Sequence, residues 1–517
     1  MGNALHSPKV AVIGAGIGGL VSALLLAHKG LDVTLFEASD TPGGKIRQVH
    51  VDGVGIDSGP TVFTMRWIFD QMLAELGSSL ESLLELEPLG ILARHAWVGT
   101  DGYLDLHSDK TLSFESIAQF TNKQEAVRFL EFCKQTQTLY NTLEKPYIRS
   151  EKPDVISMVK DLGLGGLSAL GGLGPFSSLW QSLGKHFHDP RLQQLFGRYA
   201  TYCGSSPWLA PATLMLIAQV EMDGVWSVRG GMFEVARALA AMGQTYGVTL
   251  RYGSTCERIM LKNGQVTGVC LKGGEVFASD YVVFNGDVNA LSQGLLGEEL
   301  RPSFQIPALR ERSLSAYTLS MHAQSSGFPL VRHNVFFDND YKSEFTDIFQ
   351  NRRLPQSGTV YLCAQDRDDS GLQQTPHERI LCLINAPSDD GFNTLAQPEI
   401  EKCELSRLQH LRQCGLEIQA KPHQIIRTLP QDFARLFPGS QGALYGQATH
   451  GWTSAFHRPS AKTMIPGLYL TGGSVHPGPG VPMAAMSGRI AAARLMADRD
   501  STSRSSRVVI SGGISMH

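Results

Sequence analysis

The 517-residue sequence has few of the features that mark metal-binding, disulfide-rich or nucleic-acid-binding proteins. Its eight cysteines include no C-x-x-C pair, so neither a zinc site nor a disulfide framework is indicated. The net charge is −3 and no long basic run occurs, which argues against a nucleic-acid partner. We therefore expect reduced thiols, no bound metal and no nucleic acid, as in a cytosolic protein.

Long apolar runs that could span a membrane are also missing. The longest uncharged stretch worth considering, 162–184, contains seven glycines and Pro175, a composition unsuited to a transmembrane helix. The first strand-like run, 10–13, begins too early to leave room for a secretory leader. With 42% apolar residues, the chain can form a large core and two or more domains. These features favour a cytoplasmic location.

Glycines near the start of the chain are spaced as in dinucleotide-binding folds. Gly14, Gly16 and Gly19 form a G-x-G-x-x-G pattern, in which the first makes a tight turn, the second admits a pyrophosphate and the third lets a helix approach the sheet. Glu37 ends the next strand, where its carboxylate can accept hydrogen bonds from ribose hydroxyls and disfavours NADP. The expected elements are strands 10–13 and 33–36 and a helix over about 18–29.

A second glycine-rich segment lies near the end of the chain. The sequence GGSVHPGPGVPMAAMSGR, 472–489, follows a strand-like run at 468–470. Its glycines and prolines fix a loop, and a helix of small residues is expected to begin near Val481. A fixed loop that leads into a helix N-terminus predicts a site for a polar group.

The segment TPGGK, which contains Gly43, Gly44 and Lys45, follows Glu37 closely. It resembles the second glycine motif of the FAD-containing amine oxidase and carotenoid desaturase superfamily. This resemblance implies FAD as the cofactor and an α/β fold, with a Rossmann-like FAD-binding domain and an inserted α+β substrate domain. The other FAD contacts that it implies are Gly59, Pro60, Thr61, the backbone of Cys256, Gly472, Gly473, Gly480, Val481 and Met483.

Four further blocks are similar to the bacterial phytoene desaturase-type carotenoid desaturases. They are GIDSGPTVFT, FHDPRLQQLFGRYATYCGSSPW, GVWSVRGGMFEVARALA and GLYLTGGSVHPGPGVPMAAMSGRIAAARL. Within this family, 224–226, 230–232, HGWTSAFHRP at 450–459 and GGSVHPGPGVPM at 472–483 resemble the branch that desaturates the C-3,4 bond of 1-hydroxy or 1-methoxy carotenoids. The resemblance implies hydride transfer to flavin followed by proton loss, and it leaves the final electron acceptor, oxygen or quinone, open.

The sequence leaves other functions open. The protein could instead desaturate phytoene or neurosporene, isomerise a carotenoid, or carry a carotenoid beside a flavin without catalysis. No G-x-S-x-G or H-E-x-x-H motif occurs, so no known set of catalytic side chains is indicated. His476 and His450 are the candidates for a proton acceptor or hydroxyl contact, although a loop histidine can equally bond only to backbone.

The order of the matched blocks predicts two interleaved domains. We expect 1–75, 225–290 and 460–500 to form the FAD-binding domain, and 76–224 and 291–459 to form the substrate and membrane-contact domain. Residues 501–517, rich in Ser, Gly and Arg, are expected to form a mobile tail.

A carotenoid is insoluble in water, so we expect a peripheral membrane protein that takes its substrate from a lipid membrane surface. The segment PFSSLWQSLGKHF has apolar residues at spacings of three and four, which predicts one apolar helical face. We predict that the region 155–187 docks on the membrane; the alternative is that this face packs inside the substrate domain. The face comprises Phe176, Leu179, Trp180, Leu183 and Phe187.

Overall fold

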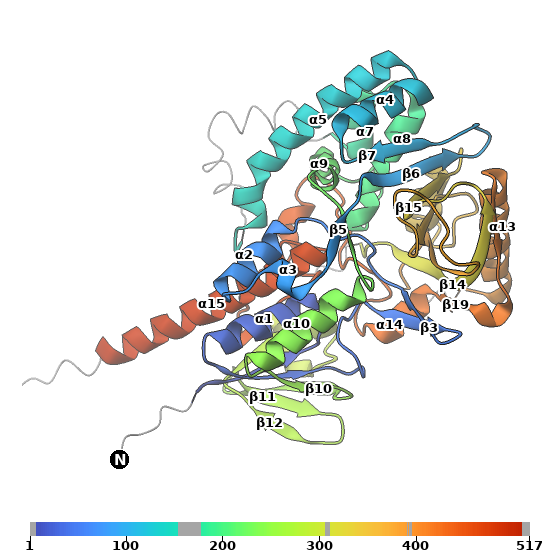
Figure 1. Cartoon of the computed structure of the whole chain (residues 1–517). Coiled ribbons are helices and arrows are strands. Elements are labelled where there is room, and N and C mark those ends of the chain that lie inside the picture. The colour runs from blue at the N-terminus through green and yellow to red at the C-terminus, as the bar shows by residue number, and fades with distance from the viewer. Residues whose placement is uncertain (1–6, 153–176, 305–310, 390, 392–394, 509–517) are drawn as a thin grey trace, which may run out of the picture.

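Five parallel strands form the first sheet, in the order β20-β13-β1-β2-β9. The computed structural model describes residues 7–152, 177–304, 311–389, 391 and 395–508 (Figure 1). The strands come from three separate parts of the chain: β1 (Lys9–Ile13), β2 (Asp32–Phe36), β9 (Thr249–Arg251), β13 (Tyr281–Phe284) and β20 (Leu468–Leu470).

Alternate side chains of these strands enter different cores. Val10, Val12 and Val33 pack with the helices on one face, whereas Ala11 and Phe36 pack with a three-stranded meander on the other. On the helical face α1 contacts both α10 and α15 (Figure 1). The helices are α1 (Ile17–His28), α10 (Phe233–Thr245) and α15 (Val481–Val508), and the meander is β10 (Cys256–Lys262), β11 (Gln265–Leu271) and β12 (Val276–Ala278).

The second sheet has eight strands, in the order β18-β14-β17-β16-β15-β6-β7, with β19 also paired to β14. All of its pairs are antiparallel except β15 with β6. Its strands are β6 (Ile91–Trp97), β7 (Leu104–His107), β14 (Ser315–Gly327), β15 (His333–Phe337), β16 (Val360–Ala364), β17 (Glu378–Ala386), β18 (Leu416–Gln419) and β19 (Ile425–Thr428).

Helices cover this sheet at one end and along its edge (Figure 1). They are α4 (Lys110–Phe120), α5 (Lys123–Leu143), α7 (Leu179–His186), α8 (Pro190–Gly197), α9 (Leu216–Met222), α12 (Tyr341–Phe349), α13 (Gln397–Gln413) and α14 (Pro430–Leu436). The smaller elements are α2 (Trp67–Glu75), α3 (Leu80–Leu83), α11 (Asn289–Ser292), β3 (Gln48–Val51), β4 (Val54–Asp57), β5 (Leu86–Pro88) and β8 (Trp226–Val228). Parallel and mixed sheets with helical layers confirm the α/β class.

The predicted membrane-docking face of α7 is wrong. Leu179, Leu183 and Phe187 are completely buried, and the Phe187 ring stacks on Phe196 in the core between α5, α7 and α8. Trp180 packs on Trp208, with ring centroids 4.5 Å apart. The periodicity correctly identified an apolar face, but tertiary packing covers that face with protein. Phe176 and the preceding part of the region, 155–176, lie outside the described residues.

The last helix also differs from expectation. Helix α15 continues to Val508, so the predicted tail does not begin at residue 501. No glycine or proline occurs between 501 and 511, and serine and arginine are tolerated in helices; residues 509–517 lie outside the described part of the chain. Among the described helices, none is both long and apolar enough to cross a membrane.

Candidate functional site

A cavity of about 1570 Å³ lies between the two sheets. On one side it reaches the carboxyl ends of β1, β2 and β13, through Ile13, Phe36 and Phe284, and on the other it meets strand β17 at Leu383. Open α/β sheets bind ligands at this carboxyl edge. Pockets for one small molecule usually measure about 300–1,000 Å³, so the cavity has room for more than one ligand.

The first glycine motif forms the turn between β1 and α1. Gly14 has φ +98°, a conformation that favours glycine, and it lines the cavity together with Gly16. A Cβ on Gly16 would lie 2.7 Å from Asn285 Nδ2. Gly19 lies outside the cavity lining and lets α1 approach the strand, because a Cβ there would lie 2.1 Å from the Gly14 carbonyl oxygen. The tight turn at Gly14 and the close approach of the helix at Gly19 therefore agree with the spacing.

Glu37 projects from the end of β2 into the same part of the cavity. Its two carboxylate oxygens accept hydrogen bonds from the backbone amides of Ala15, at 2.7 Å, and Ser39, at 2.8 Å. A carboxylate has about four lone-pair positions, so both oxygens can still accept bonds from a ligand. The bare glycine backbone beside a fixed carboxylate fits the ribose and pyrophosphate of an adenine dinucleotide.

Cys256 lines the cavity near this end. It begins strand β10, and the preceding backbone is tied to the first motif because the Ser254 amide donates to the Glu37 carbonyl oxygen at 2.7 Å. Burial raises the pKa of the Cys256 thiol to about 12. The thiol is therefore protonated at neutral pH, in agreement with a contact made through backbone.

The second glycine motif brings Lys45 into the middle of the cavity. Its neighbour Gly43 donates its amide to the Ala15 carbonyl oxygen at 2.8 Å, and Lys45 Nζ donates to the carbonyl oxygen of Leu444 at 2.5 Å. Burial lowers the pKa of Lys45 to about 8, with a smaller opposing effect of Asp287. The Lys45 amine therefore donates hydrogen bonds, and it loses its proton at a lower pH than an ordinary lysine.

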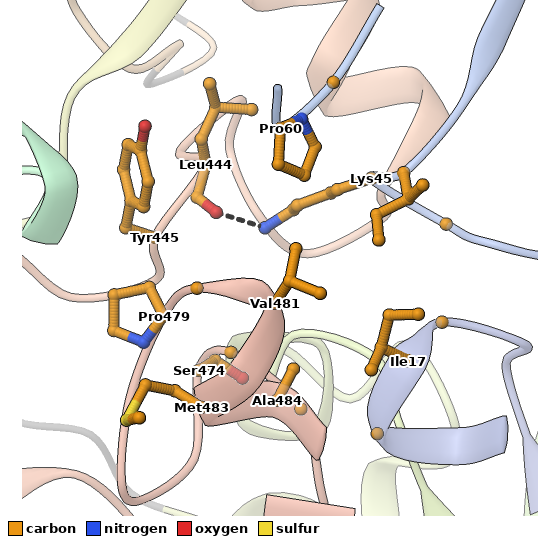
Figure 2. Close-up of a pocket in the computed structure, with 18 of the residues that line it drawn as sticks. Ile17, Lys45, Pro60, Leu444, Tyr445, Ser474, Pro479, Val481, Met483 and Ala484 are labelled. Atoms are coloured by element: carbon orange, nitrogen blue, oxygen red, sulfur yellow. Dashed lines mark hydrogen bonds between the residues drawn. The ribbon is translucent and has the colours of Figure 1, made fainter. Parts of the chain in front are cut away.

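The C-terminal loop and helix form the opposite wall. Figure 2 shows Val481, in the first turn of α15, and Ile17, in the first turn of α1, on opposite sides of one space, with Lys45 and Pro60 above them. The other predicted residues here, Gly44, Gly59, Thr61, Gly472, Gly473, Gly480 and Met483, also line the cavity. The N-terminal amides of α15 therefore open toward the cavity, a favourable place for negative charge.

Neither candidate histidine is among the cavity-lining residues. His476 Nε2 lies 3.0 Å from the carbonyl oxygens of Tyr147 and Ser150, and burial lowers the pKa of this histidine to about 4. His450 Nε2 accepts the Ser206 amide at 3.2 Å, and its Nδ1 donates to Glu311 at 3.0 Å. These hydrogen bonds of His476 go to backbone alone, whereas His450 also bonds the side chain of Glu311.

Apolar side chains from helix α9, the segment before it and strand β17 line another part of the cavity. Its walls include Leu214, Ile217, Val220, Leu381 and Leu383, a lining suited to a long hydrocarbon. Of the branch-specific segments, 224–226 and 230–232 do not reach the cavity, whereas Trp452 and Phe456 of the segment 450–459 do.

Two groups of cavity residues were missed from the sequence. Asn285 follows β13, and its Nδ2 donates to the Gly14 carbonyl oxygen at 3.1 Å; its place after a parallel strand was the signal that could have identified it. Arg198, Glu221 and Tyr361 are polar groups in the otherwise apolar part. They lie far apart in sequence, so no local spacing connects them.

Known proteins resemble the chain along most of its length. The model of the family described as flavin containing amine oxidoreductase matches residues 17–496. Hydroxyneurosporene desaturase of Rubrivivax gelatinosus is 59% identical over 515 residues, which covers 100% of this chain and 98% of that protein.

A more distant relative and a solved structure extend the comparison. The 1-hydroxycarotenoid 3,4-desaturase of a Flavobacterium strain is 31% identical, with 94% of this chain and 98% of that protein covered. A structure of putrescine oxidase bound to putrescine has a TM-score of 0.61 at 13% identity and covers 95% of this chain and 99% of its own. This likeness shows that the fold is shared.

Proposed function

Because the chain belongs to the flavin-containing amine oxidoreductase family, we propose that it is an FAD-dependent desaturase that introduces a C-3,4 double bond into a 1-hydroxy or 1-methoxy carotenoid. The observation that carries this proposal is the 59% identity, along the whole chain, with a hydroxyneurosporene desaturase. The long apolar cavity beside the glycine motifs supports it, since a polyene needs such a surface next to the cofactor.

FAD is the cofactor of this protein. We assign its adenosine end to the Gly14–Gly16 turn, Glu37 and the backbone of Cys256, and its ring end to Lys45 and the start of α15. When bound, FAD supplies the oxidising power, since it can accept the two electrons and one of the two hydrogens that a new C=C bond releases.

The protein itself binds and orients the polyene. The C–H bonds of a carotenoid are not acidic, so a general base acting alone cannot begin the reaction. The apolar walls exclude water and hold the reacting carbons beside the cofactor. The second hydrogen leaves as a proton from the neighbouring carbon, a step that needs only a weak base.

We also propose that the substrate enters from a lipid surface at the cavity rim. Trp452 lines the cavity and is 47% exposed, and Leu209 is 48% exposed. The two lie close together, because the Gly451 amide donates to the Leu209 carbonyl oxygen at 2.9 Å. A tryptophan beside an exposed leucine suits a membrane interface. Changing both residues to Ser should reduce flotation with liposomes while FAD content is kept; unchanged flotation would place the contact elsewhere.

The desaturation proposal is tested with purified protein, FAD and liposomes that contain either a 1-hydroxy carotenoid or the same carotenoid without the hydroxyl. A red shift of the polyene absorption with the hydroxylated substrate is expected, because each added double bond lengthens the conjugation. Faster turnover of the unsubstituted carotenoid would favour the phytoene or neurosporene desaturase alternative. A carrier without catalysis would leave the absorption of bound FAD unchanged under anaerobic conditions with the substrate present.

A further inference from the structure

Arg198 is a cation in the wall of the cavity, which the apolar residues Leu214, Ile217 and Val220 also line. It begins the short helix Arg198–Cys203 directly after α8. Within the described part of the chain, its guanidinium makes one hydrogen bond, from Nη1 to Tyr202 Oη at 3.3 Å. The guanidinium carbon also lies 5.4 Å from the centre of the Tyr202 ring and 5.1 Å from that of Tyr361.

A second arginine in the cavity wall is bound quite differently. Arg458 donates to the carbonyl oxygens of Tyr445, Gln447 and Gly473 at 3.1–3.3 Å, so its donors are used to fix the surrounding loops. A guanidinium has five N–H donors, and burying donors without acceptors is costly. Among the described residues, Arg198 therefore keeps donors that can bond an oxygen of a ligand in the cavity.

Glu221 and two tyrosines hold Arg198 in place and balance its charge. The Glu221 carboxylate accepts hydrogen bonds from Tyr199 Oη at 2.6 Å and Tyr202 Oη at 2.7 Å. The Tyr202 hydroxyl thus donates to Glu221 and accepts from Arg198. Burial raises the pKa of Glu221, although both tyrosine bonds favour its anion. Each carboxylate oxygen of Glu221 therefore has one donor, whereas Arg198 has N–H groups with no acceptor among the described residues.

The position of this group in the cavity indicates which ligand atom it meets. Tyr361 Oη lies 2.6 Å from Thr61 Oγ1, and Thr61 follows Pro60, which faces Lys45 and Val481 (Figure 2). Arg198 is therefore close to the part of the cavity assigned to the FAD ring. In a 1-hydroxy or 1-methoxy carotenoid, the oxygen on C-1 lies within about 5 Å of C-3 and C-4, given bonds of about 1.5 Å. A group that recognises this oxygen must lie near the reacting carbons.

We propose that Arg198, positioned by Tyr202 and Glu221, donates a hydrogen bond to the C-1 oxygen of the substrate and so selects carotenoids with an oxygen on C-1. This inference rests on the proposed function. A donor suits both substrate types, because a hydroxyl and a methoxy oxygen each accept a hydrogen bond. Without that oxygen, the donors of Arg198 stay unpaired against hydrocarbon.

The test compares wild type, Arg198→Met and Arg198→Lys on a 1-hydroxy carotenoid and its unsubstituted analogue. In Arg198→Met, the ratio of kcat/KM for the two substrates should fall roughly 10- to 100-fold, the effect of losing one charge-assisted hydrogen bond. Turnover of the unsubstituted analogue should be kept or rise, and Arg198→Lys should restore part of the ratio. The matched control is Arg191→Met on α8, whose guanidinium pairs with Asp189 away from the cavity.

Two further measurements make the outcome decisive. Retained FAD shows that each variant is folded. If Arg198→Met loses FAD, Tyr202→Phe replaces it in the test, because this change removes the hydroxyl bonded to Arg198. Tyr202→Phe should then lower the ratio of kcat/KM for the two substrates. Binding of both carotenoids, followed by tryptophan fluorescence, should show the same loss of preference. An unchanged ratio, or parallel loss with both substrates in a folded variant, would overturn the role of Arg198. Failure of wild type to desaturate either carotenoid would instead contradict the proposed function, and binding preference alone would then decide the role of Arg198.

Discussion

Replacing Glu37 by Ala should release FAD from the protein. The carboxylate lies at the end of β2, with the residue 9% exposed, and it is held by the amides of Ala15 and Ser39. Those two bonds fix the carboxylate before the ligand arrives, so its remaining lone pairs are already aimed into the cavity. Ala removes both the ligand contacts and the acceptor for the two amides.

The size of the effect follows from the number of bonds lost. A hydrogen bond to a charged group is worth about 1.5–3 kcal/mol, so two ribose bonds contribute about 3–6 kcal/mol to FAD affinity. Since 1.4 kcal/mol corresponds to a factor of ten, the Kd of FAD should rise roughly 100-fold or more. Glu37→Gln keeps the volume and one acceptor oxygen, so its loss of affinity should be intermediate.

Both variants are assayed by flavin absorbance after gel filtration and by titration of the apoprotein with FAD. Glu115→Ala, a change at an exposed glutamate of α4, is the matched control and should keep full occupancy. Circular dichroism of the apoproteins separates loss of affinity from loss of fold. If Glu37→Ala is folded and binds FAD as tightly as wild type, the assignment of Glu37 to the ribose is wrong.

Three further changes test packing and charge. Gly19→Ala should lower the Tm of the apoprotein by an amount equivalent to about 1–3 kcal/mol, because its Cβ would meet the Gly14 carbonyl oxygen; an unchanged Tm would contradict the close approach of α1. Leu183→Ala should cost about 2–5 kcal/mol in a denaturant titration, whereas Leu209→Ala, at an exposed leucine, should cost under about 0.5 kcal/mol; equal values would contradict burial of α7. His476 has a folded pKa of about 4, below its unfolded value of about 6.5, so wild type should lose stability as pH falls from 6.5 to 4. His476→Gln should flatten that dependence by up to about 3 kcal/mol in thermal melts and should keep desaturase activity. Loss of activity in a variant that keeps FAD would show that the histidine takes part in the reaction.

Much of the backbone that we propose to bind the cofactor was predicted from the sequence because its signals are local. The turn at Gly14–Gly19, the acid at Glu37 and the helix start at Val481 each depend on a few neighbouring residues and on backbone geometry. A G-x-G-x-x-G turn has the same shape wherever it joins a strand to a helix. The strands and helices that frame these motifs accordingly have the predicted bounds to within one residue at α1, β1, β2 and β20.

What covers an apolar face was decided only by the tertiary structure. The spacing of Leu179 and Leu183 establishes one face on α7, but a membrane and a protein core select the same side chains. In the folded chain that face meets the aromatic core around Phe187 and Phe196. Hydrophobic burial is non-directional. The spacing of apolar residues along a helix therefore does not show whether their face packs against protein or against lipid.

The polar group around Arg198 likewise could not be predicted from the sequence. Arg198, Glu221 and Tyr361 come from a helical segment, a second helix and a strand of the mixed sheet, and no spacing relates them. Their meeting depends on how helices α8 and α9 pack against the second sheet. The sequence by itself determined the local backbone proposed to surround the cofactor, since glycine turns and helix starts are set by near neighbours. The folded chain alone decided which distant side chains line the cavity, because long-range packing brings them together.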